Sequence, residues 1–316
     1  MCGITGISYK DKLVNTDRLW SATDTLAHRG PDDRGIYISR NQRSGLGHRR
    51  LSFIDISASG RQPLSDTDRM LHVTFNGEIY NYQKLRRALE KEGCHFTTKT
   101  DTEVLLHGYK IWGDLLPDKL DGMFAFAIFD EEKQAWFLCR DRFGIKPLYY
   151  AFTKNTFLFG SEIKAILAYD AIEKQVRPES ISLFLANRYV PCPQTIWRNI
   201  YQVHPGHFIH LNMNTWEKEE LPYWTLTTNE LIEDQEASHV KFIAGLKQAV
   251  QSHLTADVPV GSFLSGGYDS SALVYMMQKE LNYPTEAFAI GFKGWESSED
   301  KYAAIVAEIT DAKLHT

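Results

Sequence analysis

The sequence predicts two consecutive domains of different fold class, and three observations support this prediction. Residues 1–211 contain many short apolar strands, turn signals between them and a few helices without strict alternation, which is typical of an α+β layered domain. Residues 239–316 alternate strand, helix, strand, helix, which indicates the beginning of an α/β domain with a parallel sheet. Residues 212–238 are rich in Thr, Glu, Asn and Asp, and we expect them to form an irregular linker.

The elements of the first domain follow from local periodicity and turn residues. Short apolar or alternating runs predict four strands, at residues 71–75, 123–129, 135–139 and 156–160. The first run is expected to end at Asn76-Gly77, and the second and third are expected to pair as a hairpin. Helical spacing predicts helices at residues 82–92, which Gly93 follows as a stop signal, and at residues 102–112.

The second domain is expected to begin with a helix, because apolar residues recur there at three-to-four spacing. The apolar positions are Val240, Ile243, Leu246, Val250 and Leu254. A strand at 258–264, a helix that runs to Leu281, a strand at 286–291 and a helix at 299–309 follow. The chain is therefore expected to stop two strands into an open sheet, which would leave an unpaired edge.

Composition excludes several classes of protein. The chain has 35 Lys and Arg against 40 Asp and Glu, a net charge of −5, which argues against a dedicated nucleic-acid binder or a membrane-surface protein. The longest apolar run, residues 123–129, is far shorter than the ~20 residues needed to span a bilayer. The N-terminus shows no secretory signal, and the four cysteines show no C-x-x-C spacing. We therefore expect a cytoplasmic protein without a disulfide framework or a structural zinc site.

The first chemical feature is Cys2, which becomes the N-terminal residue once Met1 is removed. Its α-amino group would have a reference pKa of about 7.7–8.0, so it can be neutral near pH 7 and accept the proton of its own thiol. One residue would then supply both nucleophile and base, as in N-terminal-nucleophile catalysis. Taken alone, Cys2 fits an accidental second residue on a frayed terminus better than a nucleophile.

Other motifs follow in a fixed order along the chain. They are His28-Arg29-Gly30-Pro31-Asp32-Asp33, Gly47-His48-Arg49-Arg50-Leu51-Ser52, Phe75-Asn76-Gly77-Glu78-Ile79-Tyr80-Asn81, Thr100-Asp101-Thr102-Glu103, Leu120-Asp121-Gly122-Met123-Phe124-Ala125 and Arg140-Asp141-Arg142-Phe143-Gly144-Ile145-Lys146-Pro147-Leu148. With these motifs the sequence resembles the class II glutamine amidotransferases, in the asparagine synthetase branch. The resemblance implies an αββα fold of the N-terminal-nucleophile hydrolase type, followed by the beginning of an ATP-pyrophosphatase domain. It also implies a glutamine-hydrolysing ligase of the asparagine synthase type, without a prosthetic group.

The resemblance assigns the catalytic groups of the first domain. Cys2 would attack the side-chain amide carbon of glutamine. The side-chain N–H of Asn76 and the backbone N–H of Gly77 would form the oxyanion hole, where each donor contributes roughly 3–4 kcal/mol. The alternative for Asn76-Gly77 is a hairpin turn. His28 and His48 could act as general bases, but the α-amino group would already fill that role, so we interpret them as structural.

The resemblance also assigns the glutamine-binding groups. Arg50 would bind the α-carboxylate, for which a planar guanidinium is better suited than an ammonium. Glu78 and Asp101 would bind the α-ammonium group, and Asn76 and Gly77 would complete the set. The alternatives are that Arg50 forms half of a surface ion pair and that Asp101 caps the helix at residues 102–112, a role compatible with ligand binding.

The second chemical feature is a Ser/Gly-rich loop between a strand and a helix, without the lysine of a Walker motif. Backbone N–H groups at such a helix N-terminus bind anions. The loop resembles the S-G-G-x-D-S segment of enzymes that cleave ATP between the α- and β-phosphates. The resemblance implies that the ATP-binding residues are Leu264, Ser265, Gly266, Gly267, Asp269, Ser270, Ser271 and Ile290, with Asp269 as a partner for Mg²⁺. The alternative is a generic turn that caps a helix.

The two halves together predict a glutamine-dependent amidotransferase whose substrates are glutamine, ATP and a carboxylate acceptor, by default aspartate. The same chemistry could amidate another carboxylate, such as a sugar acid or a natural-product precursor. Two other hypotheses stay open: an N-terminal-nucleophile hydrolase that acts without ATP, and a non-catalytic regulatory or assembly subunit in which Met1 is retained. The resemblance is compatible with a homodimer, although the sequence does not define an oligomeric state.

Two departures from the family pattern bear on the acceptor and on the second domain. Tyr268 stands where the loop most often has leucine. Asparagine synthetases continue beyond the position of Thr316 for roughly the same length again. This continuation carries the rest of their ATP domain. We therefore expect residues 239–316 to be a fragment of that domain, a part completed by another chain, or a vestige.

Overall fold

The computed structural model describes residues 1–228, 234–295 and 298–316. It divides into two compact units, Met1–Leu226 and Thr227–Thr316, which are described separately. The part of the predicted linker at residues 229–233 lies outside the described residues. Within the described residues, no helix combines the length and the apolar character needed to cross a membrane.

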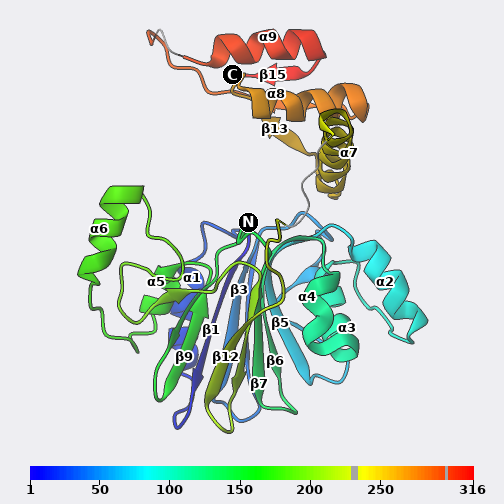
Figure 1. Cartoon of the computed structure of the whole chain (residues 1–316). Helices are drawn as coiled ribbons and strands as arrows, with labels where there is room; N and C mark the ends of the chain where they lie inside the picture. The colour runs from blue at the N-terminus through cyan, green and yellow to red at the C-terminus, as the bar shows by residue number, and fades with distance from the viewer. Residues whose placement is uncertain (229–233, 296–297) are drawn as a thin grey trace. The chain divides into compact units, whose positions relative to one another are not determined.

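The first unit consists of two six-stranded antiparallel sheets (Figure 1). Sheet A has the order β10 (Tyr201–Gln202), β8 (Tyr149–Phe152), β9 (Thr156–Gly160), β1 (Gly3–Tyr9), β3 (Ser44–Arg50) and β2 (Asp33–Ile38). Sheet B has the order β12 (Glu217–Pro222), β11 (His207–Asn212), β7 (Ala135–Arg140), β6 (Gly122–Asp130), β5 (Leu71–Ile79) and β4 (Leu64–Ser65). A buried, largely aromatic core that includes Phe129, Trp136 and Phe159 joins the two sheets.

Helices cover the outer face of each sheet. On sheet A these are α1 (Thr16–Asp24) and α5 (Ile163–Leu167), and on sheet B they are α2 (Tyr82–Lys91), α3 (Thr102–Trp112) and α4 (Leu116–Lys119). Helix α6 (Pro178–Asn187) and the 3-10 turns η1 (Ala58–Gly60) and η2 (Gly113–Leu115) complete the unit. The layer order helix, sheet, sheet, helix confirms the predicted αββα fold.

The predicted strands and helices of the first domain all form, with two corrections. The strand predicted at 71–75 does not end at Asn76-Gly77 but runs to Ile79, paired throughout with β6. A Cβ atom at Gly77 would lie 2.3 Å from the Met123 carbonyl oxygen, so glycine permits close approach of β6 here instead of making a turn. The linker prediction is wrong at Glu217–Pro222, because β12 forms there and pairs with β11. It is an edge strand, and most of its side chains are exposed.

The second unit is a parallel three-stranded sheet with the order β13 (Gly261–Phe263), β14 (Glu286–Phe288) and β15 (Lys313–His315). Helix α8 (Tyr268–Tyr275), the π-helical turn η3 (Met276–Glu280) and α9 (Asp300–Thr310) connect these strands, and α7 (Gln235–His253) precedes them. The two-strand prediction is therefore corrected to three strands. Strand β15 has only three residues and no apolar run, so its pairing with β14 decides its conformation.

The apolar stripe predicted for the first helix of this unit is only partly buried. Val250 is buried and packs near Met276 and Met277, whereas Val240 is 63% exposed. The helix itself begins at Gln235, because the Asp234 carboxylate caps it by accepting from the backbone N–H groups of its first turn. Only the C-terminal part of the stripe therefore contributes to a core in the described residues.

Candidate functional site

Cys2 lies directly before β1 and is 7% exposed. Its Sγ atom accepts a hydrogen bond from the Leu51 backbone N–H at 3.5 Å, and its carbonyl oxygen accepts one from Arg29 Nε at 2.9 Å. Burial raises the pKa of the Cys2 thiol. The nucleophile predicted from the sequence is therefore held at the end of a central strand rather than on a frayed terminus, and its thiol needs a base to become reactive.

The backbone N–H of Gly77 faces the free edge of β5. Gly77 lies opposite Phe124 of β6. Both backbone groups of Phe124 form hydrogen bonds on the side of β6 that faces away from β5. The Phe124 carbonyl accepts from Asp141 N at 2.8 Å, and the Phe124 N–H donates to Asp141 Oδ2 at 3.2 Å. In an antiparallel ladder the N–H and C=O of a residue point to the same side, so Gly77 and Phe124 form a non-hydrogen-bonded pair. The Gly77 N–H consequently points away from β6.

The neighbouring outward N–H groups on β5 are held by side chains. The Phe75 N–H donates to Gln62 Oε1 at 2.7 Å, and the Ile79 N–H donates to Asp101 Oδ2 at 3.0 Å. Gly77, between them, lines a cavity at this edge. The residues that line this cavity, called the Cys2 cavity below, are Cys2, Arg50, Leu51, Phe53, Ile54, Gly60, Gln62, Phe75, Gly77, Thr100, Asp101 and Thr102.

The Asn76 side chain is fully buried, and both its Nδ2 and Oδ1 atoms lack a hydrogen-bond partner among the described residues. Side chains alternate along a strand, and two residues earlier the Thr74 hydroxyl donates to the Gly47 carbonyl of β3 at 3.2 Å. Asn76 therefore points between the sheets, toward the sheet whose strand β1 begins after Cys2. A buried amide without partners costs about 1–3 kcal/mol, which indicates a group kept for a ligand.

Arg50 is buried, and its guanidinium donates to backbone carbonyl groups of the segment that follows it. Nη1 donates to Ser57 O at 2.7 Å, and Nη2 donates to Ile54 O at 3.4 Å and to Asp55 O. Arg50 forms no ion pair with any described residue, so the surface ion-pair alternative is wrong. Arg50 also lines the Cys2 cavity, with the Nη1 and Nη2 donors of its guanidinium engaged by these carbonyl groups.

Asp101 is buried at the N-terminus of α3, and burial raises the pKa of its carboxyl group to about 6, with the neighbouring Glu78 charge adding to the shift. Its Oδ2 atom accepts from Ile79 N, and its Oδ1 atom accepts from the Thr100 hydroxyl at 3.2 Å. Asp101 occupies the N-cap position of α3 as the alternative predicted, but its side chain makes no capping bond to the helix. Glu78 is half-buried on β5 and lies outside the residues that line the cavity.

Of the six glutaminase residues predicted from the sequence, the structure brings four together around the Cys2 cavity, and the other two flank Gly77 on β5. Sequence reasoning missed Gln62, which is buried and joins β5 to α3 because its Nε2 also donates to the Thr102 hydroxyl at 3.1 Å. No sequence signal marks this isolated glutamine. The cavity measures about 20 Å³, room for about one water molecule.

The two histidines considered as bases have other partners. His28 Nε2 contacts Glu162 Oε1 at 2.8 Å on the surface. His48 is fully buried and bonded to the Phe75 carbonyl at 3.1 Å, and burial lowers the pKa of its ring to about 3. A neutral His48 that joins β3 to β5 fits the structural interpretation.

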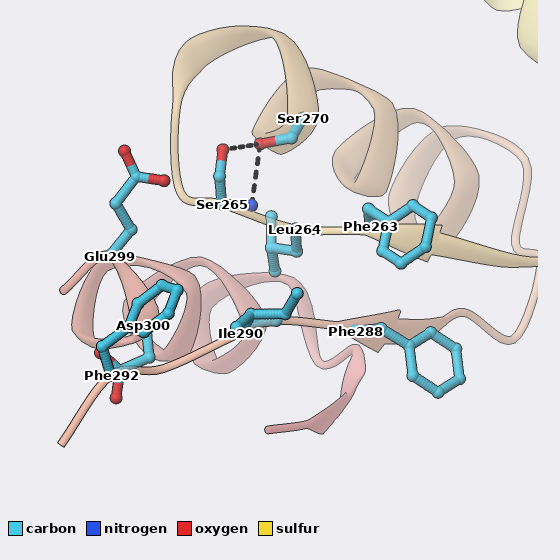
Figure 2. Close-up of a pocket in the computed structure, with 10 residues that line it drawn as sticks. Phe263, Leu264, Ser265, Ser270, Phe288, Ile290, Phe292, Glu299 and Asp300 are labelled. Atoms are coloured by element: carbon cyan, nitrogen blue, oxygen red, sulfur yellow. Dashed lines mark hydrogen bonds between the residues drawn. The ribbon is translucent and has the colours of Figure 1, made fainter.

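In the second unit, a cavity lies at the C-terminal ends of β13 and β14, and four predicted ATP-binding residues line it: Leu264, Ser265, Ser270 and Ile290. Figure 2 shows the two serines on one side of this cavity and Ile290 on the other. The hydroxyl groups of Ser265 and Ser270 lie 3.1 Å apart, and the Gly267 N–H donates to Ser265 Oγ at 3.3 Å. The cavity volume is about 320 Å³.

The remaining predicted loop residues lie around this cavity rather than on its wall. Gly266 has a φ of +83°, and a Cβ there would lie 2.4 Å from the Cβ of Tyr302, so glycine is needed where α9 approaches the loop. Asp269 is exposed in the first turn of α8, and the Ser271 hydroxyl is buried without a partner among the described residues. Sequence reasoning missed the wall residues Phe263, Phe288, Ala289, Phe292, Glu299 and Asp300.

Comparison with known proteins matches each unit to a family model. Residues 1–224 match the family model of the glutamine amidotransferase domain, and residues 241–316 match that of asparagine synthase. The glutamine phosphoribosylpyrophosphate amidotransferase of Bacillus subtilis aligns over 99% of this chain and 65% of its own, with a TM-score of 0.54 and 17% identity. This structural likeness supports the fold of the chain.

Curated relatives extend beyond this chain. A putative asparagine synthetase (glutamine-hydrolyzing) of Methanocaldococcus jannaschii is 35% identical over 334 residues, which cover all of this chain and 64% of the relative. Asparagine synthetase (glutamine-hydrolyzing) 3 of Bacillus subtilis is 36% identical over 314 residues, covering 96% of this chain and 49% of the relative. This chain thus spans about half to two thirds of the relatives' length. The chain belongs to the glutamine amidotransferase domain family, and its residues 241–316 match asparagine synthase.

Proposed function

We propose that the first unit hydrolyses glutamine to glutamate and ammonia, with Cys2 as nucleophile. The observation that carries this proposal is the pair of donors at adjacent positions of β5: the Gly77 N–H, on the edge of β5 that lines the Cys2 cavity, and the buried Asn76 amide, which has no partner among the described residues. Donors that have no protein partner in the folded chain need no reorganisation to bind a developing oxyanion.

The proposed reaction uses the α-amino group of Cys2 as base, once Met1 is removed. The amine accepts the thiol proton, and the thiolate adds to the side-chain carbonyl carbon of glutamine. The oxyanion that forms accepts hydrogen bonds from Asn76 and Gly77. The C–N bond then breaks, ammonia leaves with the proton from the α-ammonium group, and water hydrolyses the thioester to release glutamate.

We propose that the segment at residues 51–60 moves when glutamine binds. The Cys2 cavity of about 20 Å³ is too small for glutamine, and the guanidinium of Arg50 is bonded to carbonyl groups of that segment. Displacing the segment would enlarge the cavity and free the Arg50 fork for the substrate α-carboxylate. Asp101 and Glu78 would then face the α-ammonium group, whose charge favours the ionised form of both carboxylates.

The second unit is proposed to take part in ATP binding. The Ser265–Ser271 loop offers hydroxyl and N–H donors at the start of α8, which suits the pyrophosphate that leaves when a carboxylate becomes an acyl-adenylate. The acceptor proposed by default is aspartate, and ammonia would displace AMP from the adenylate to give the amide. Mg²⁺ binds through one or two carboxylates together with substrate phosphates, a donor set that the exposed Asp269 fits; it would neutralise phosphate charge.

The test is glutamate release from glutamine without ATP, after intact mass shows that Met1 is absent. The wild-type chain should release glutamate, and Cys2→Ala should not. Cys94→Ala is the matched control, because Cys94 is also a free thiol of the first unit but lies outside the Cys2 cavity. Equal activity in the wild type and Cys2→Ala would refute the assignment. Binding of ATP to the wild type, measured by calorimetry and compared with Gly266→Ala, tests the second unit separately.

A further inference from the structure

Gln62 is a buried amide at the point where the edge pairing of β5 stops. It is 6% exposed and lies two residues before the first residue pair of β4 with β5, which joins Leu64 to Val73. An antiparallel ladder continued by two residues would place Gln62 opposite Phe75. The Gln62 side chain takes the place of that backbone partner, because its Oε1 atom accepts from the Phe75 N–H at 2.7 Å. Since a backbone N–H only donates, this bond fixes the orientation of the amide.

The other end of the Gln62 amide leads to Asp101. Its Nε2 atom donates to the Thr102 hydroxyl at 3.1 Å. The Thr100 hydroxyl lies 3.1 Å from Thr102 Oγ1 and 3.2 Å from Asp101 Oδ1. The second carboxylate oxygen of Asp101 accepts from the Ile79 N–H at 3.0 Å. These bonds, called the Gln62 network below, join four buried polar side chains.

The Gln62 network brackets the Gly77 N–H. It begins at the N–H of Phe75 and returns to β5 at the N–H of Ile79, two residues before and two residues after Gly77. Because alternate N–H groups of a strand point to the same side, these three groups share one edge of β5. Phe75 and Gly77 both line the Cys2 cavity. A buried network whose members are bonded to one another is rigid, so the strand between its two ends is held in place.

We propose that Gln62 is a positioning residue for the oxyanion donor. It occupies the Phe75 N–H and fixes the edge of β5, so that the Gly77 N–H stays open and aimed into the Cys2 cavity. This inference rests on the proposed glutaminase function, and Gln62 acts through β5 rather than on the reacting atoms. The position matters because an oxyanion donor acts only at hydrogen-bond distance, and a displacement of about 1 Å can lower the rate by roughly 10²-fold.

The experiment measures kcat and KM for glutamate release in the wild type and in Gln62→Met, which keeps the length of the side chain and removes both polar atoms. The kcat value should fall by about 10- to 100-fold. The KM value should stay within about threefold, because the oxyanion forms only on the way to the transition state.

Thr102→Val interrupts the same network at its next member, because it removes the hydroxyl to which Gln62 donates. It should lower kcat as well. The double variant should be no slower than Gln62→Met, since both changes break one link and their effects are then not additive. If Gln62→Met does not fold, Thr102→Val decides the question alone: a kcat equal to that of the wild type would overturn the inference.

Alkylation of Cys2 by iodoacetamide separates positioning from a defect in folding. The thiolate sulfur forms a bond to a saturated carbon and iodide leaves, so no oxyanion develops and no oxyanion donor is needed. The reaction is followed on the N-terminal peptide by mass spectrometry. Gln62→Met should be alkylated at the rate of the wild type although its kcat is low. Equal losses of alkylation and of turnover would show a structural role and would overturn the inference.

Gln202→Met is the matched control. The Gln202 amide also bonds to the backbone of the first unit, since its Nε2 donates to the Gln194 carbonyl at 3.2 Å, but Gln202 does not line the Cys2 cavity. Its kcat should equal that of the wild type. A normal kcat in Gln62→Met would overturn the inference and leave the glutaminase function standing, whereas a wild type that releases no glutamate would refute both.

Discussion

Replacing Asn76 by alanine should lower catalysis without lowering stability. Both polar atoms of this buried side chain lack partners among the described residues, so the folded state bears a desolvation penalty of about 1–3 kcal/mol. Truncation removes that penalty and leaves a small cavity that costs roughly 0.5–1 kcal/mol. The net effect on unfolding free energy should lie between zero and about 2 kcal/mol in favour of the variant, a Tm rise of up to roughly 4–8 °C.

The catalytic effect should have the opposite sign. Loss of one oxyanion donor lowers kcat by about 10²–10³, while KM should change little, because the donor acts on charge that exists only in the transition state. The assay is steady-state glutamate release together with thermal unfolding of the same preparation. A gain in stability together with a loss of activity is the pattern expected where a residue is retained for function although it lowers the stability of the folded state.

Asn81→Ala provides the matched control. The Asn81 amide is fully used, since Nδ2 donates to the Lys119 carbonyl at 2.9 Å and Oδ1 accepts from the Asp121 N–H at 3.0 Å. This variant should lose about 1–2 kcal/mol of stability and keep its kcat. The reasoning is refuted if Asn76→Ala is destabilised by more than about 1 kcal/mol, which would show that its amide is bonded, or if its kcat stays within about twofold.

Three further predictions follow from single positions. Gly77→Ala should lower stability by about 2–4 kcal/mol, measured by denaturant unfolding, because the new Cβ would lie 2.3 Å from the backbone oxygen of Met123; an unchanged midpoint contradicts this. Asp101 has a folded pKa of about 6 against a reference of 3.8, so the folded state binds more protons and stability should fall by about 3 kcal/mol as pH rises from about 3 to 7. Asp101→Asn should flatten this dependence of stability on pH. An unaltered dependence would show that another group causes it. Gly266→Ala, at φ +83° and against Tyr302, should unfold the second unit at lower temperature and weaken ATP binding, with glutaminase activity retained; normal ATP affinity would be inconsistent with this.

The order of motifs along the chain predicted the family, and the match of residues 1–224 to the glutamine amidotransferase domain confirms that prediction. Local periodicity was sufficient for strong elements such as β6, β7 and α3, which have long apolar patterns. It was insufficient for β15 and β12, whose conformations depend on neighbours distant in sequence. The apparent turn signal Asn76-Gly77 was misleading for the same reason, since pairing with β6 overrides it.

Tertiary structure alone decided the arrangement of the site. The sequence placed Cys2 and Asn76 in one list of candidates, but only the packing of sheet A on sheet B leaves the Asn76 amide buried without partners. Gln62 carries no local signature, because its role comes from contacts with residues far along the chain. The sequence by itself determined which groups are available for chemistry; the fold determined which of them are desolvated, bonded or left open, since these properties depend on what surrounds each group in space.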